Sequence, residues 1–110
     1  MSFEAGLYEI RFQTPFGEGA GVAYLDGGKL RGGDSMMAYV GIYSESSDSL
    51  NADVRAYKHT NVPGMASVFG VDQVDIHLEG TVNGGSASLK GTAPQAPGVV
   101  LQVTMERLHD

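Results

Sequence analysis

Apolar and polar residues alternate one by one along several segments of this chain. In the clearest of them, residues 74–82, Val74 and Ile76 alternate with Asp75 and His77. Successive side chains of a β-strand point to opposite faces, so this pattern predicts a strand with one buried and one solvent-facing side. The same alternation recurs in residues 8–12, 50–57 and 99–106. These segments predict an antiparallel sheet.

Turn sequences separate the segments. Asn83-Gly84 and Asp26-Gly27 supply the positive φ angles that tight hairpins need. The polar stretch 45–48 can close a third hairpin. The further strands that these turns delimit are residues 19–25, 29–31, 37–43 and 86–92. Within residues 61–70, Pro63 can open a short helix, because proline fits the first helical turn.

About eight antiparallel strands in sequence expose two sheet edges unless the sheet closes on itself. The sequence therefore predicts an all-β protein: one closed antiparallel barrel of about eight strands over residues 1–110, with one short helix near 61–70. A barrel of this size is either filled by its own side chains or holds one small ligand.

The charge balance restricts the partners. Asp and Glu outnumber Lys and Arg by 13 to 7, giving a formal net charge of −6. The basic residues are scattered singly, whereas nucleic-acid binding depends on clustered Lys and Arg. We therefore expect no direct nucleic-acid partner, and a basic protein surface is the more natural one.

No cysteine is present, so a disulfide framework and a thiolate zinc site are both excluded. The first residues lack the basic and apolar regions of a signal peptide, and no apolar run approaches the ~20 residues of a membrane span. We therefore expect a cytoplasmic protein without membrane contact.

The stretch Gly32-Gly33-Asp34-Ser35 is a candidate catalytic motif, because a serine stands beside an aspartate. A serine hydrolase of the G-x-S-x-G type, however, needs a strand–turn–helix elbow, and the residues around Ser35 predict strands. The favoured interpretation is a structural turn in which the Asp34 carboxylate accepts backbone N–H groups. Asn83 and Gly84 form the second structural turn of this kind.

Three other motifs carry little chemistry. The glycine-rich stretch 17–21 lacks the lysine and helix of a phosphate-binding loop. His77 and Glu79 share a strand face, but a metal site would need a third ligand such as His59. The carboxylates of Asp72, Asp75 and Glu79 lie in a pattern typical of a wet strand face. We expect no enzyme, no metal site and no cofactor.

The strand at 37–43 is apolar on both faces. Met37, Tyr39 and Tyr43 share one face, and Ala38, Val40 and Ile42 share the other. One face must line the barrel, and a second copy of the chain is the simplest cover for the other. Met37, Tyr39 and Tyr43 are therefore expected to form either a homodimer interface or the barrel lining.

The stretches LRGGDSMMAYVGIY (30–43), SVFG (67–70) and HLEGTVNGGSASLKG (77–91) resemble the GrlR family, whose founding member is a negative regulator of type III secretion. The resemblance implies a lipocalin-like barrel of eight strands, usually dimeric, with an apolar interior. It also implies sequestration of a DNA-binding transcriptional activator through an acidic Glu-Asp-Glu-Asp surface motif. The nearest match here is Glu45-Ser46-Ser47-Asp48, with Asp53 nearby, so serine replaces half of the acidic residues.

Two functions follow from these observations. The first is a non-enzymatic regulatory protein that binds a basic transcriptional activator, or another protein, through the acidic hairpin 45–48. The alternative is a carrier or sensor of a small apolar ligand inside the barrel. The alternative is favoured by small residues at expected interior positions, namely Ala52, Ala56, Gly80 and Ala87.

Overall fold

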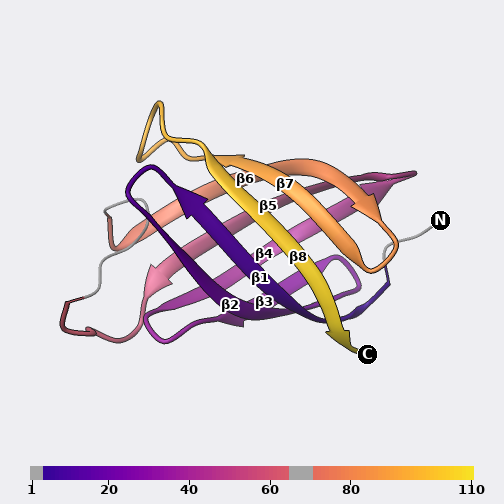
Figure 1. Ribbon diagram of the computed structural model, residues 1–110, viewed down its shortest axis with the longest axis horizontal. Helices are drawn as coiled ribbons and strands as arrows, with labels where there is room; N and C mark the ends of the chain where they lie inside the picture. Colours follow the sequence, from indigo (N-terminus) through magenta and orange to yellow (C-terminus); the bar gives the residue numbers. More distant parts are fainter. Residues whose placement is uncertain (1–3, 65–70) are drawn as a thin grey trace.

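The computed structural model describes residues 4–64 and 71–110, whose eight strands form one closed barrel (Figure 1). Each strand pairs antiparallel with its neighbours in sequence, and β8 pairs back with β1. The strands are β1 (Gly6–Thr14), β2 (Gly17–Asp26), β3 (Lys29–Gly33), β4 (Met37–Ser46), β5 (Ser49–Lys58), β6 (Gln73–Asn83), β7 (Ser86–Thr92) and β8 (Leu101–His109). The expected all-β closed antiparallel barrel is confirmed, and its closure gives each of the eight strands a paired neighbour on both sides.

The alternation seen in the sequence sets which side chains point inward. In β5, Leu50, Ala52, Val54 and Ala56 are buried, and the residues between them are exposed. The register keeps inward positions side by side, since Ala52 lies opposite Tyr43 of β4 and Leu78 of β6. A shift of one residue would turn this apolar set outward, so burial itself fixes the register.

Tight turns join most of the strands. Gly27 (φ 59°) and Gly84 (φ 63°) adopt the left-handed backbone conformation at the β2–β3 and β6–β7 turns, where glycine carries no steric penalty. The predicted turns at Asp26-Gly27 and Asn83-Gly84 are therefore present. Ser47 (φ 56°) takes the same conformation in the β4–β5 turn.

Gly32 and Gly33 differ from the expectation, because they end β3 and do not form the turn. Gly32 pairs with Ala23 and with Tyr39, and a Cβ on Gly32 would overlap the Val22 carbonyl oxygen. The close approach of β2 and β3 thus requires a glycine there. The turn itself begins at Asp34.

The short helix expected near 61–70 is also not formed in the part of that range that the structure describes. Residues 61–64 form a loop with a turn at Pro63 and Gly64, whose φ of 81° is incompatible with a helix. The rest of the expected helix, residues 65–70, lies outside the described residues.

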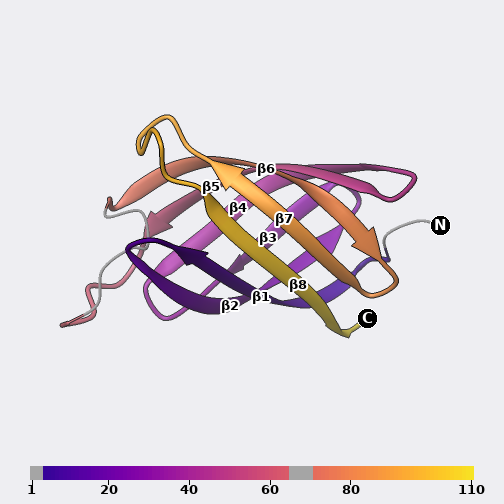
Figure 2. The same ribbon diagram turned by 45° about the horizontal axis from the view of Figure 1, so that its top comes forward.

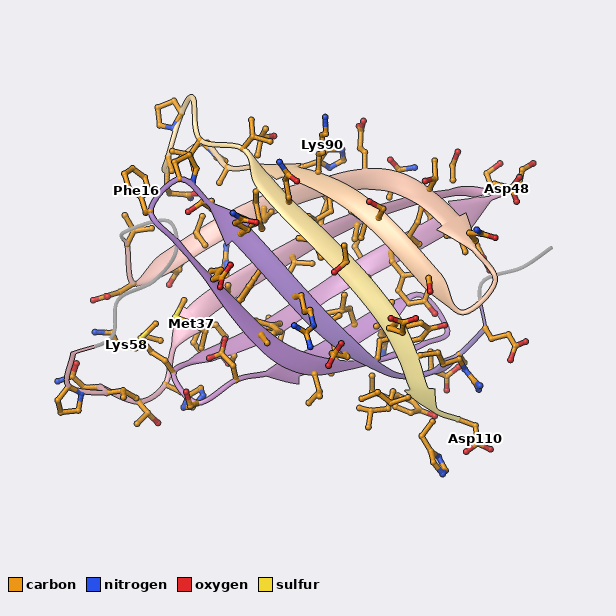
Figure 3. All side chains as sticks on the ribbon, in the orientation of Figure 1. Phe16, Met37, Asp48, Lys58, Lys90 and Asp110 are labelled. Atoms are coloured by element: carbon orange, nitrogen blue, oxygen red, sulfur yellow. The ribbon has the colours of Figure 1, made fainter. Side chains whose placement is uncertain are left out.

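The barrel has two ends of different construction, which the two ribbon views show (Figures 1 and 2). At the end that we call the hairpin end lie the β2–β3, β4–β5 and β6–β7 turns. At the opposite end, called the mouth end, lie the β1–β2 and β3–β4 turns, the segment after β5 and the β7–β8 connection. Asp48 marks the hairpin end, and Phe16, Met37 and Lys58 mark the mouth end (Figure 3).

Candidate functional site in the barrel interior

Large side chains fill the hairpin end of the barrel. Tyr8, Leu25 and Leu50 point inward there and are each at most 1% exposed. The Tyr8 hydroxyl donates to the Glu4 carbonyl oxygen at 2.6 Å, so its polar tip has a partner despite burial. Burial raises the pKa of Tyr8, which keeps this hydroxyl a donor. These residues close the interior from one side.

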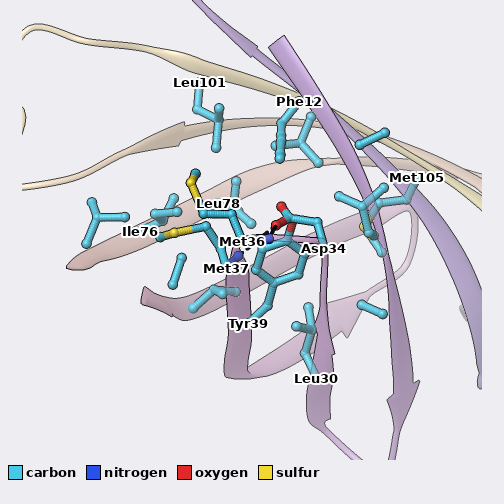
Figure 4. Close-up of a pocket in the computed structure, with 18 of the residues that line it drawn as sticks. Phe12, Leu30, Asp34, Met36, Met37, Tyr39, Ile76, Leu78, Leu101 and Met105 are labelled. Carbon is cyan, nitrogen blue, oxygen red and sulfur yellow. Dashed lines mark hydrogen bonds between the residues drawn. The ribbon is translucent and has the colours of Figure 1, made fainter. Parts of the chain in front are cut away.

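The mouth end, in contrast, contains a cavity of about 150 Å³ (Figure 4). Its walls are mostly apolar side chains of several strands, including Ile76 and Leu78 of β6 and Leu101 and Met105 of β8. The small side chain of Ala56 also lines it. A dry apolar cavity of this volume can hold a molecule the size of benzene.

Two carboxylates belong to the cavity lining, those of Glu18 and Asp34, and the Asp34 carboxylate lies at the β3–β4 turn. Its Oδ1 accepts the backbone N–H groups of Met36 (2.8 Å) and Met37 (2.7 Å), as expected for an aspartate that stabilises a turn. The Asp34 N–H donates to the Met37 carbonyl oxygen at 2.9 Å, which closes the turn. Sequence reasoning thus assigned Asp34 its structural role but not its place beside a cavity.

Tyr39 completes this polar spot, since its hydroxyl donates to Oδ2 of Asp34 (Figure 4). Burial, and next the Asp34 carboxylate, raise the pKa of Tyr39, so the hydroxyl remains protonated at neutral pH. Its ring packs edge-on against Phe12, with the ring centroids 6.2 Å apart and the planes at 77°. Both rings line the cavity.

Backbone hydrogen bonds hold the turn against the segment that follows β5. The Met36 carbonyl oxygen accepts the N–H groups of His59 (2.9 Å) and Thr60 (3.3 Å), and the His59 ring lies 3.0 Å from the Asp34 carbonyl oxygen. The cavity wall at Asp34 is therefore fixed by bonds on two sides.

The barrel wall has a notch beside this turn, because β3 is much shorter than β2. Residues Gly17–Gly21 of β2 pair with β1, but the pairing between β2 and β3 begins only at Val22. Asp34 and Tyr39 lie next to Gly21, where a Cβ would meet the Tyr39 hydroxyl at 2.8 Å. Glu18 and Ser35 line the cavity at this notch.

Of the residues expected at a dimer interface or in the barrel lining, all three face the interior. Met37 is 5% exposed and lines the cavity together with Tyr39. Tyr43 packs against the core at the hairpin end. The outer face of β4 carries Ile42, which is 62% exposed.

The four hairpin residues expected to bind a partner, Glu45 to Asp48, are exposed at the hairpin end (Figure 3). Asp53 does not belong with them. It lies on the outer wall of the barrel, where its carboxylate contacts the His77 ring at 2.8 Å. Asp53 is the fifth residue of β5, and an extended strand places it too far from the turn to act together with the hairpin residues.

The other chemical motifs are dispersed. The second ring nitrogen of His77 contacts Glu79 at 2.8 Å, but His59 lies at the mouth end, beside Asp34. Among the residues that the structure describes, no group of three or more His, Asp or Glu side chains is arranged to hold a metal ion.

The three candidate carboxylates have separate partners. Asp72 pairs with Lys58 at 3.3 Å, and Asp75 pairs with Arg55 at 2.8 Å and accepts from Gln95. Glu79 contacts His77. No two of them face each other across a cleft, as an acid–base pair of a glycosidase would.

A second hollow, of about 430 Å³, lies on the outer wall over β4, β5 and β6. It is a groove open to solvent, and the Arg55–Asp75 and His77–Asp53 pairs form part of its lining. The interior cavity is smaller, but apolar walls enclose it, which is the usual character of a small-molecule site.

No protein-family model matches this chain, and no curated protein matches it. Within the described residues there is also no helix of sufficient length and apolar character to cross a membrane.

Sequence reasoning left open whether the interior is filled or holds a ligand, because alternation shows which residues point inward but not how well they fill the space. Of the four small residues expected inside the barrel, Ala56 lines the cavity, whereas Ala52, Gly80 and Ala87 do not. The positions of small residues in the sequence therefore do not by themselves locate the cavity.

Proposed function

We propose that this protein binds a small apolar molecule in the mouth half of its barrel and acts as a carrier or sensor of that molecule. The observation that carries the proposal is the cavity of about 150 Å³ with apolar walls. Well-packed interiors seldom leave voids larger than a water molecule, so a cavity of this size needs a reason. The cytoplasm is the location that we propose for this function.

A titration with small neutral probes tests the proposal. Benzene and hexanol, added to ¹⁵N-labelled protein, should shift the backbone amide signals of cavity-lining residues such as Val54 and Ile76. Ala56→Leu should abolish these shifts, because the larger side chain occupies the cavity. Ala38→Leu is the matched control, since Ala38 lies on the neighbouring strand outside the cavity lining. Failure of both probes to bind the unmodified protein would refute the proposal.

A second candidate is a regulator that binds a basic transcriptional activator, in the manner implied by the resemblance to the GrlR family. The exposed Glu45 and Asp48 at the hairpin end favour it, because acidic side chains on a protruding turn attract a basic surface. Glu45→Lys with Asp48→Lys should then abolish co-purification of the activator. Glu106→Lys, which changes charge on β8, should not. Binding that persists in the double variant would contradict this candidate.

We also propose that the chain forms a homodimer through the outer face of β2 and β4. Val22 and Tyr24, each 43% exposed, and Ile42 make this face apolar. Analytical ultracentrifugation should give a dimer mass for the unmodified protein and a monomer mass for Ile42→Asp. A monomer mass for the unmodified protein would contradict the dimer.

A further inference from the structure

We infer that the ligand of the cavity is a small apolar molecule that carries an amino group, and that it enters through the notch between β2 and the β3–β4 turn. The inference rests on the ligand-binding function proposed above and names the chemical class of the ligand.

The notch gives the cavity an opening through the barrel wall. Gly17–Gly21 of β2 have no pairing with β3. The Phe12 ring covers Gly19, and Tyr39 and Asp34 lie beside Gly21, whereas no described atom other than those of its chain neighbours lies within 4 Å of the place where a Cβ of Gly17 would stand. At the opposite end, Tyr8, Leu25 and Leu50 block access. A ligand therefore enters most directly beside Asp34 and Glu18.

The charges at this opening are all negative. Glu18 and Asp34 are the charged residues among those that line the cavity, and the described lining contains no Lys, Arg or His. Two basic residues of the mouth end have partners of their own, since Lys58 pairs with Asp72 and the His59 ring lies 3.0 Å from the Asp34 carbonyl oxygen. Residues 65–70, outside the described part, contain no basic residue in their sequence. A carboxylate ligand would meet like charge at the notch, and an ammonium group would meet opposite charge.

Asp34 has capacity for one more donor. A carboxylate offers about four acceptor positions. Two are used on Oδ1 by the N–H groups of Met36 and Met37, and one on Oδ2 by the Tyr39 hydroxyl. One acceptor position therefore remains on Oδ2, and Asp34 is among the residues that line the cavity. An ammonium group is a donor only, so it satisfies this acceptor and is itself satisfied.

The aromatic side chains beside Asp34 suit the same head group. Phe12 and Tyr39 are in edge-to-face contact and both line the cavity. Aromatic ring faces attract cations within about 6 Å. The methionine side chains of Met36, Met37 and Met105, which adapt their shape readily, suit an alkyl chain. The volume of about 150 Å³ limits the ligand to roughly the size of hexylamine.

The test compares three ligands of equal chain length on the full chain at pH 7 by isothermal titration calorimetry. We expect hexylamine to bind about tenfold more tightly than hexanol, and hexanoate at least about tenfold more weakly than hexanol. Glu18→Gln and Asp34→Asn should each reduce the preference for hexylamine over hexanol by about threefold or more.

Glu106→Gln is the matched control, because it removes one negative charge on β8 away from the cavity. Glu18 is exposed on β2 and does not accept the N–H groups of the β3–β4 turn as Asp34 does, so Glu18→Gln remains informative even where Asp34→Asn does not fold. Hexanol or hexanoate binding as tightly as hexylamine would overturn the inference and leave the proposed ligand-binding function intact. Failure of all three ligands to bind would overturn both.

Discussion

The hairpin end and the mouth end of the barrel are built from the same eight strands, but they differ in how their interiors are filled. At the hairpin end, Tyr8, Leu25 and Leu50 meet in the interior and exclude solvent. At the mouth end, a cavity remains beside Ala56, and the Asp34 carboxylate is held in its wall by backbone N–H groups. The comparison indicates that the two ends of one sheet serve different purposes. The hairpin end stabilises the fold by packing, and the mouth end provides a candidate ligand-binding site.

The largest expected effect comes from deleting a packed side chain. Leu50→Ala should lower the free energy of unfolding by about 4–5 kcal/mol, and Leu101→Ala, beside the cavity, by about 2–3 kcal/mol. Leu101 already faces empty space on one side and has fewer contacts to lose. Urea unfolding monitored by circular dichroism measures both values. Equal losses would show that the two ends are packed alike.

Enlarging a buried side chain should also destabilise the packed part of the interior more than the part beside the cavity. Ala52 is buried outside the cavity lining, so Ala52→Leu should lower the free energy of unfolding by about 1–3 kcal/mol through overpacking. Ala56→Leu has room in the cavity and should change it by less than about 1 kcal/mol. The free energies of unfolding of the two variants, measured by thermal and urea unfolding, compare the same substitution at two positions of β5. A larger loss for Ala56→Leu would remove the basis for the cavity.

Tyr39→Phe tests the polar spot of the mouth end. The variant loses the hydroxyl that donates to Asp34, so we expect a loss of about 0.5–1.5 kcal/mol in the free energy of unfolding. Tyr57→Phe is the control, because Tyr57 is 39% exposed on the outer wall, and it should change stability by less than that. An identical effect of the two substitutions would contradict the role given to the Tyr39 hydroxyl.

The smallest effect concerns His77, which belongs to neither end. Hydrogen bonding to Asp53, and next to Glu79, raises the pKa of His77 above its ordinary value of about 6.5. The protonated ring therefore stabilises the fold below about pH 6.5, and this contribution is lost as the pH rises through the raised pKa. An NMR titration of the ring should show a lower pKa in Asp53→Asn. The same variant should bind cavity ligands normally, and any loss of binding would show that the outer wall and the mouth end are coupled.

The strands were predictable from the sequence because alternation and turn residues act locally. Leu50 to Ala56 on β5, and the turn at Asn83-Gly84, follow from side-chain period and backbone preference alone. Gly32 was wrongly assigned to a turn. A glycine is required there because β2 approaches β3 closely, and a contact between two strands cannot be inferred from the residues next to Gly32 in the sequence.

The site was less predictable, because it depends on lengths and volumes that no short motif encodes. Asp34 was expected to stabilise a turn, and it does so. Its position beside a cavity follows from two features: β3 is short, and the Ala56 side chain is small. Asp34 and Ala56 come from different parts of the chain and line the same cavity. The partnership of Asp53 with His77 likewise depends on the β5–β6 register.

The pairing of β8 with β1 also governs when the barrel can form during synthesis. Leu7 lies opposite His109, so the seam joins segments about a hundred residues apart in the chain. At translation rates of about 5–20 residues per second, β1 leaves the ribosome on the order of 5–20 s before β8 can reach it. Until then its unpaired edge is a template for other strands in the cell. The nascent chain therefore has no enclosed interior, and any ligand of this barrel is captured only after the last strand has been made.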